Sequence, residues 1–143
     1  MEAHGMAGHL IRRLHQISTQ IFLTRVREAG FDITSVQFAA MDALLENPGI
    51  DQAGVATLIA YDRATIGGVI DRLVSKGLVE RVVSQQDRRA REVRLTDDGV
   101  RVFEALVPVV RSVQDEILGQ LTAAERKRFM ALARIATRAK LED

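Results

Sequence analysis

The sequence contains no cysteine, only two prolines and 4% aromatic residues. Without cysteine there is no disulfide, no thiolate metal site and no thiol-based redox switch, and a reducing cytoplasm is the expected location. Few aromatic residues beside many Ala, Leu, Val, Ile and Arg favour helices over a β-sandwich. No apolar run approaches the roughly 20 residues of a membrane span, and the N-terminus lacks the pattern of a secretory signal. We therefore expect no membrane partner.

Charge of one sign is also scarce over the whole chain, because the net charge is only +1. The segment 63–94 departs from this balance, with eight arginines and lysines against four acidic residues. A local basic stretch on a nearly neutral chain indicates a surface for a polyanion.

Hydrophobic spacing and capping signals predict six helices and one hairpin. In order, these are helices at about 7–28, 34–45, 52–59 and 63–75, strands at 78–83 and 91–95, and two helices that begin at the capping sequences 96–99 and 122–125. A helical pair that runs into a hairpin is the winged form of a helix-turn-helix. The predicted fold is therefore mainly α with a small β-hairpin wing.

The segment 52–69 has the pattern of a helix-turn-helix. Ala56 is small where the two helices must cross closely, and Ala60 is small in the turn, where glycine is commoner. Apolar residues that would lock the second helix onto the first follow at Val55, Ile59, Ile66 and Val69. An ordinary pair of short packed helices is the alternative, and the adjacent basic hairpin favours DNA binding.

The exposed face of the helix at 63–75 is predicted to carry short side chains. Gly67 and Gly68 lie there, although each glycine costs about 1 kcal/mol relative to alanine inside a helix. A loosely packed helix would explain them. The functional alternative is that the missing side chains let this helix lie deep in the major groove. Arg63 and Thr65, near its N-terminus, are then predicted to reach base edges, and Arg72 a phosphate.

The loop between the two strands contains Asp87, Arg88 and Arg89. Most charged turns are simply solvated. A hairpin that follows a DNA-contacting helix, however, lies over the neighbouring backbone, and an arginine at its tip can enter a narrow minor groove. We expect Asp87 to hold Arg89 in orientation. The predicted DNA-binding residues are Arg63, Thr65, Gly67, Gly68, Arg72, Asp87, Arg88 and Arg89.

Three runs, Leu73–Arg81, Asp87–Arg89 and Val93–Gly99, resemble the MarR family of bacterial transcriptional regulators. The segment Thr34–Phe38 is similar as well, and the resemblance covers essentially the whole chain. It implies a homodimer that binds a pseudo-palindromic operator, usually as a repressor released by a small ligand. The family's wing motif, Asp-x-Arg, corresponds to Asp87 and Arg89. Members that sense through cysteine are excluded here.

The helix that begins at 96–99 predicts a dimer independently of this resemblance. Its apolar residues cover about half of its circumference, whereas a surface helix needs a stripe of roughly 100°. The first and last helices add further apolar positions. The surplus indicates a second chain, although cover by the chain's own helices is an open alternative. We expect residues 1–31 and 100–143 to form a helical dimerisation body and 32–99 the winged DNA-binding domain.

The first helix combines cationic and hydrogen-bonding residues with apolar ones. His9 and Arg13 share a face, and His15 borders the apolar side. Such groups suit an aromatic or other organic acid, which many MarR-like proteins sense, and a solvated basic edge is the alternative. The predicted ligand-binding residues are His9, Arg13, His15, Phe22, Phe38 and Met41.

Two other classes of protein were weighed against a regulator. An enzyme is disfavoured because all three histidines lie within the first 15 residues, and no cysteine nucleophile, phosphate-cradling loop or metal cluster is evident. We accordingly expect no catalytic residue, metal or cofactor. A helical protein–protein interaction module without DNA binding would explain the first and last helices but not the basic hairpin.

Overall fold

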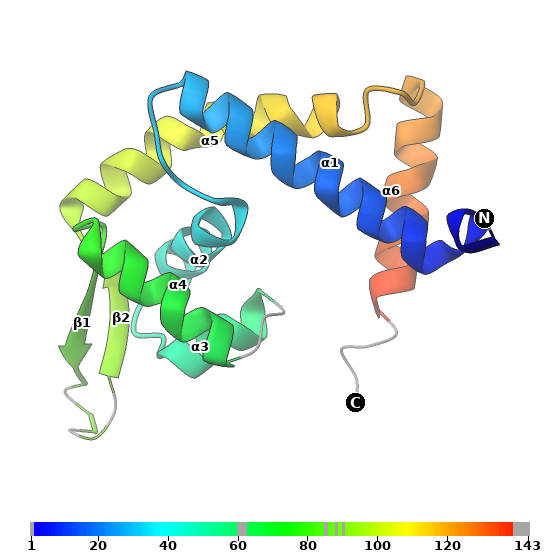
Figure 1. The fold of residues 1–143 in the computed structure, drawn as a ribbon. Helices are drawn as coiled ribbons and strands as arrows, with labels where there is room; N and C mark the ends of the chain where they lie inside the picture. The colour runs from blue at the N-terminus through cyan, green and yellow to red at the C-terminus, as the bar shows by residue number, and fades with distance from the viewer. Residues whose placement is uncertain (1, 60–62, 85, 88, 90, 139–143) are drawn as a thin grey trace.

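The computed structural model describes residues 2–59, 63–84, 86–87, 89 and 91–138. It is mainly helical with one two-stranded antiparallel hairpin, as predicted (Figure 1). A short 3-10 helix at the N-terminus was not predicted. The elements are η1 (Glu2–Gly5), α1 (Ala7–Glu28), α2 (Ser35–Glu46), α3 (Gln52–Leu58), α4 (Arg63–Ser75), β1 (Val79–Val83), β2 (Arg91–Leu95), α5 (Asp97–Ile117) and α6 (Ala123–Arg138).

Side-chain caps start several helices where the sequence predicts them. The Thr34 hydroxyl accepts a hydrogen bond from the backbone N–H of Gln37, whose side chain accepts one from the Thr34 N–H in return. Asp51 caps α3 through the N–H of Gly54 at 2.8 Å, and Thr96 caps α5. These bonds satisfy N–H groups that the first turn of a helix leaves without a partner.

The base of the hairpin is fixed to its neighbours by backbone contacts. The N–H of Val93, on β2, donates to the carbonyl of Ile50 at 3.0 Å, and Asp51 forms an isolated bridge with Glu92. At the start of α5, a Cβ on Gly99 would lie 2.0 Å from the carbonyl oxygen of Leu78, so only glycine permits this approach. The hairpin is therefore in close backbone contact with the start of α3 and with the start of α5.

One hydrophobic core runs through the described part of the chain. It joins the inner faces of α1 and α5 to the winged part, and its fully buried side chains come from both. The largest of them are Met41, Ile66, Ile70, Leu73, Leu106, Val26, Val55, Val93 and Val113. The winged part is thus held by its own chain and by the long helices.

The long helices α1 and α5 lie antiparallel along one side of the molecule, and α6 turns away from them at the end remote from the hairpin (Figure 1). Arg25 of α1 binds both carboxylate oxygens of Glu116 on α5, at 2.8 and 2.5 Å. The hydrogen bonds from Arg25 lower the pKa of the Glu116 carboxyl. Among the described residues, no helix is long and apolar enough to cross a membrane.

Candidate nucleic-acid interface

Helix α4 has two contrasting faces. Ile66, Val69, Ile70 and Leu73 are buried against the core, and Ala64, Thr65, Asp71, Arg72 and Ser75 are exposed. Within the part of the chain that the structure describes, a Cβ on Gly68 would meet only the Arg72 guanidinium, at 3.9 Å, and one on Gly67 would meet only the Gln52 amide nitrogen, at 3.4 Å. The exposed face is therefore short-chained, as predicted, and the helix backbone is open to approach.

Several of the predicted DNA-contacting positions lie partly or wholly outside the described residues. Arg63 is the first residue of α4, but its side chain is outside them, and so is the whole of Arg88. The predicted turn residue Ala60 is also outside. Ala56 is buried at 2% exposure, as the close crossing of α3 and α4 requires.

The tip of the hairpin is shaped by side chains that bind backbone groups. The Ser84 hydroxyl accepts from the N–H groups of Gln86 and Asp87, at 3.2 and 3.3 Å. The Asp87 carboxylate accepts from the backbone N–H of Arg89 at 3.0 Å. Asp87 thus holds the backbone of Arg89, and its effect on the orientation of the Arg89 side chain stays a prediction. Arg89 itself is exposed.

A polar network at the base of the hairpin was missed by the sequence analysis. The Arg81 guanidinium, on β1, donates to Asp71 of α4 at 2.6 Å and to Gln52 of α3 at 3.2 Å. The Arg81 guanidinium therefore joins three elements, β1, α4 and α3, whose contacting residues are far apart in the sequence. No spacing rule links these residues, because their proximity depends on how the strand packs beside the helices.

Comparison with known proteins decides the family. A sequence model of the MarR family matches residues 31–90. The transcriptional regulator HosA of Escherichia coli is 35% identical over 134 residues, which are 94% of this chain and 96% of HosA. The chain belongs to the MarR family.

Solved MarR-family structures share this fold over nearly the whole chain. BpsR of Bordetella bronchiseptica, whose DNA binding is regulated by 6-hydroxynicotinic acid, is 31% identical, with a TM-score of 0.85 and 94% of each chain covered. The transcriptional repressor CouR, bound to a 23-mer DNA duplex, is 27% identical, with a TM-score of 0.81 and 97% of this chain and 96% of CouR covered. This MarR-family chain is a DNA-binding transcriptional regulator.

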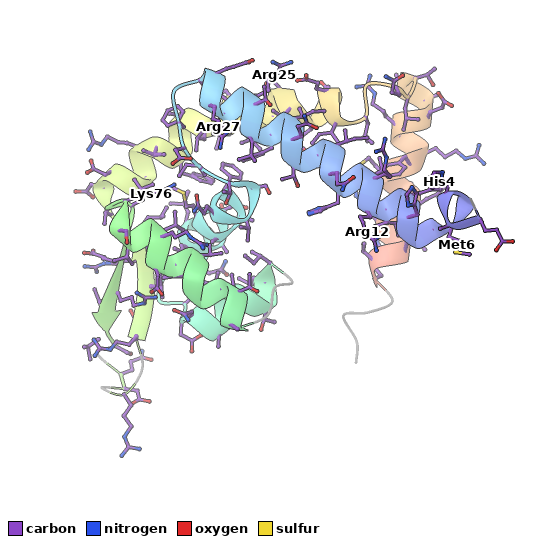
Figure 2. The ribbon with its side chains drawn as sticks, in the orientation of Figure 1. His4, Met6, Arg12, Arg25, Arg27 and Lys76 are labelled. Atoms are coloured by element: carbon purple, nitrogen blue, oxygen red, sulfur yellow. The ribbon has the colours of Figure 1, made fainter. Side chains whose placement is uncertain are left out.

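The C-terminal end of α4 is tied to the segment between α1 and α2 in this MarR-family protein. The ammonium group of Lys76, which Figure 2 labels near the end of α4, donates to the backbone carbonyl of Asp32 and, at 3.3 Å, to the side-chain oxygen of Gln37. Gln37 is buried and also completes the cap of α2. The position of α4 is therefore linked to the start of α2.

A cleft of about 330 Å³ lies between α1, α2 and α4. It is lined by His15, Thr19, Thr34, Ser35, Val36, Gln37, Val69 and Arg72. His15 is the one predicted ligand residue in this lining, which also includes Arg72, predicted as a phosphate contact. One wall of the cleft is therefore formed by α4, the helix predicted to contact DNA.

The other predicted ligand residues do not gather around this cleft. Met41 and Phe22 are buried in the core, and Phe38 stacks on Phe103 with ring centroids 5.0 Å apart. His9 stacks on His4 near the N-terminus, and Arg13 is exposed. Arg13 and His15 are about 200° apart around α1, since each residue turns the helix by about 100°. The predicted set of six is therefore not one site in this structure.

Proposed function

We propose that the protein is a homodimeric repressor that binds a pseudo-palindromic operator and leaves it when a small aromatic or heteroaromatic carboxylate binds. The observation that carries this proposal is the bare, short-chained face of α4 beside an arginine-bearing hairpin. A backbone open on one side can approach base edges closely, and the family's helix enters the major groove in this manner.

In this arrangement, the N-terminal turn of α4 supplies the base contacts. Arg63 and Thr65 are the residues we assign to base edges, and Gly67 and Gly68 allow the close approach. Arg88 and Arg89 of the hairpin are assigned to the flanking minor groove, where negative potential attracts arginine. Two such units would contact half-sites about one helical turn apart.

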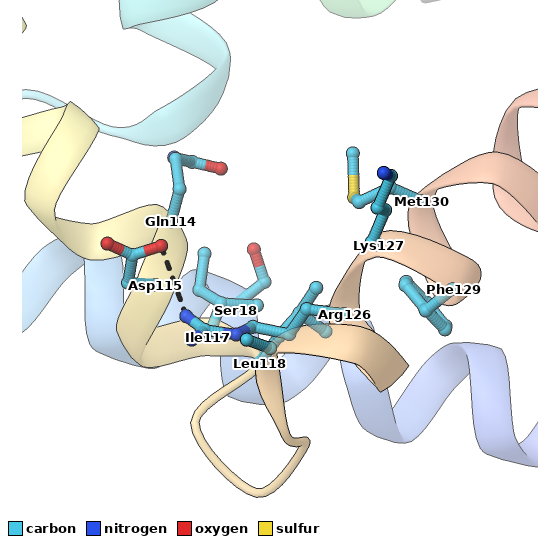
Figure 3. A pocket seen from close by; sticks show the side chains of 10 residues that line it. Ser18, Gln114, Asp115, Ile117, Leu118, Arg126, Lys127, Phe129 and Met130 are labelled. Carbon is cyan, nitrogen blue, oxygen red and sulfur yellow. Dashed lines mark hydrogen bonds and ion pairs between the residues drawn. The ribbon is translucent and has the colours of Figure 1, made fainter.

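The exposed apolar side chains of α1 and α6 support the dimer. Leu132 and Ile135 are 58% and 63% exposed, and Leu10 and Ile11 of α1 are exposed as well. A groove of about 580 Å³ is lined by residues of α1, α5 and α6, which include Phe129, Met130 and the Asp115–Arg126 ion pair (Figure 3). Water-exposed apolar surface of this extent favours burial against a second copy. We assign residues 1–31 and 100–143 to this dimerisation body and 32–99 to the winged domain.

The cleft between α1, α2 and α4 supports an effector site. A guanidinium such as that of Arg72 binds a carboxylate through two parallel hydrogen bonds, and the His15 imidazole can donate another. The cleft has one wall on α1 and one on α4, so an occupant would favour one spacing between these helices. If that spacing differs from the DNA-bound one, DNA affinity falls.

The test begins with genomic fragments selected by the native protein, which provide the operator. Aromatic acids, with 6-hydroxynicotinic acid as the first probe, are then added to operator titrations. We expect at least one acid to weaken binding tenfold, which needs about 1.4 kcal/mol of preference for the released state. A binding site without dyad symmetry, or no response to any acid, contradicts the corresponding part of the proposal.

Two matched variants locate the site on one side of α1. His15→Ala should abolish the response to the acid, and Arg13→Ala, on the opposite side of the helix, should retain it. The reverse result would move the effector site away from the cleft.

A further inference from the structure

Arg81 lies where the two predicted DNA-contacting elements meet. Its guanidinium binds Asp71 on the exposed face of α4 at 2.6 Å and Gln52 at the start of α3 at 3.2 Å. The side chain of Arg81 is 31% exposed, whereas that of Asp71 is 68% exposed. The arginine is thus the more enclosed partner, and the carboxylate faces outward.

Asp71 is the one acidic residue of α4. A carboxylate on a face that approaches DNA repels the phosphates, because each carries a negative charge. Arg81 offsets this charge directly. Both hydrogen bonds come from its Nη2 nitrogen, so Asp71 and Gln52 together hold this end of the guanidinium in place.

Gln52 extends the same network to the glycine pair. Its side-chain oxygen accepts from Arg81, and its amide nitrogen lies 3.4 Å from the place where a Gly67 side chain would begin. The Gln52 side chain, which Arg81 binds, therefore lies beside the bare stretch of α4 at Gly67.

The opposite strand of the hairpin is fixed by its backbone, through Val93 with Ile50 and Glu92 with Asp51. Arg81 provides a side-chain link from β1 to α4, opposite Val93 in the strand register. From these contacts, we propose that Arg81 is a positioning residue for DNA binding. It sets the angle between the hairpin and α4 and neutralises Asp71, and it does not itself bind a phosphate.

The proposal depends on DNA binding and not on the dimer or the effector. The test uses the native protein's tightest genomic fragment and a scrambled duplex of the same length, each titrated over a range of salt. Arg81→Met should weaken binding to the selected fragment about tenfold and to the scrambled duplex less, because both duplexes meet the uncovered Asp71 carboxylate but only the selected fragment requires the angle between the hairpin and α4. Its salt slope should change less than when a phosphate contact is lost.

Arg89→Ala is the matched contact variant. It should flatten the salt slope by about one unit, as the loss of a phosphate or groove contact does, while the fold is kept. If Arg81→Met flattens the slope in the same way and weakens both duplexes equally, Arg81 is a phosphate contact and the proposal is wrong.

Asp71→Asn and the double variant provide the second readout. In Arg81→Met/Asp71→Asn, the loss should not exceed that of Arg81→Met alone, because both changes remove one interaction. Additive effects would contradict the proposal. The exchange Asp71→Arg with Arg81→Asp keeps the net charge and restores the pair, so it should recover preference for the selected fragment. If Arg81→Met fails to fold, this exchange variant tests the proposal in its place. A folded exchange variant that does not prefer the selected fragment to the scrambled duplex overturns the proposal.

Discussion

Helices α4 and α6 both expose one side, but the two sides differ in chemistry. The exposed side of α4 is short and polar, and its opposite side is buried in the chain's own core. Helix α6 has no buried residue, and Leu132 and Ile135 face outward. The difference shows that α4 is complete within one chain and suits a polar, charged partner. Helix α6 has apolar surface that its own chain does not cover.

The largest expected effect comes from placing charge on α6. Leu132→Asp with Ile135→Asp should give a folded monomer, because neither residue supports the core of its own chain. Operator affinity should fall about 100-fold or more, since two linked half-site contacts become independent. Sedimentation velocity and operator titration measure the two effects.

Thr137→Asp is the control for this pair, because it adds a charge on another side of the same helix. It should remain dimeric and bind the operator. A double variant that sediments like the native protein would show that α6 does not join the two copies.

The second largest effect tests the bare face of α4. Gly68→Leu should lower operator affinity at least 100-fold while the melting temperature stays the same or rises slightly. In the free protein the first carbon of the new side chain would meet only the flexible Arg72 guanidinium among the described residues, at 3.9 Å, and glycine is the poorer helix former. On DNA, it would stand between the helix and the bases.

Ala105→Leu adds the same bulk on the exposed side of α5 and is expected to change neither property. Native operator affinity in a folded Gly68→Leu protein would show that this face does not approach the groove closely.

The smallest effect concerns the ion pair that joins α1 to α5. The pKa of Glu116 is lowered in the folded protein. The ionised carboxylate therefore stabilises the fold at pH values above its pKa in the unfolded chain, and this stabilisation is lost as the pH falls through its lower pKa in the folded protein. Glu116→Gln should therefore lower the melting temperature slightly at pH 7, and the difference should disappear as the pH falls below the lowered pKa of Glu116. Glu104→Gln, on the same helix, is the reference. A difference in melting temperature that persists in acid would indicate that Glu116 stabilises the fold through packing rather than through its charge.

The sequence predicted those features that depend on local pattern. Helix starts followed from Thr34, Asp51 and Thr96, because a cap and its N–H partner lie three residues apart. The buried side of α4 followed from its helical period. The hairpin followed from a β-branched run and an alternating polar and apolar run on either side of a polar loop. The MarR family followed from motifs in the winged segment.

The features that the sequence did not predict depend on packing between distant segments. The Arg81–Asp71 pair and the Asp51–Glu92 bridge need the hairpin to lie beside α3 and α4 in one register. The ligand prediction grouped residues by chemistry on α1. It could not show which side of α1 faces α2 and α4, or that Phe38 would stack on Phe103 in the core.

The close contact between Gly99 and Leu78 gives α5 the mechanics of a lever. Thr96 adds two hydrogen bonds to the carbonyls of Leu78 and Gly77, so the first turn of α5 moves with the base of the hairpin. The 21 residues of α5 span about 30 Å at 1.5 Å per residue. A rotation of about 5° at its far end would carry the hairpin roughly 3 Å, which is close to the spacing of about 3.4 Å between stacked base pairs. A small angular change in the helical body is thus converted, at the other end of α5, into a displacement of about one base-pair step.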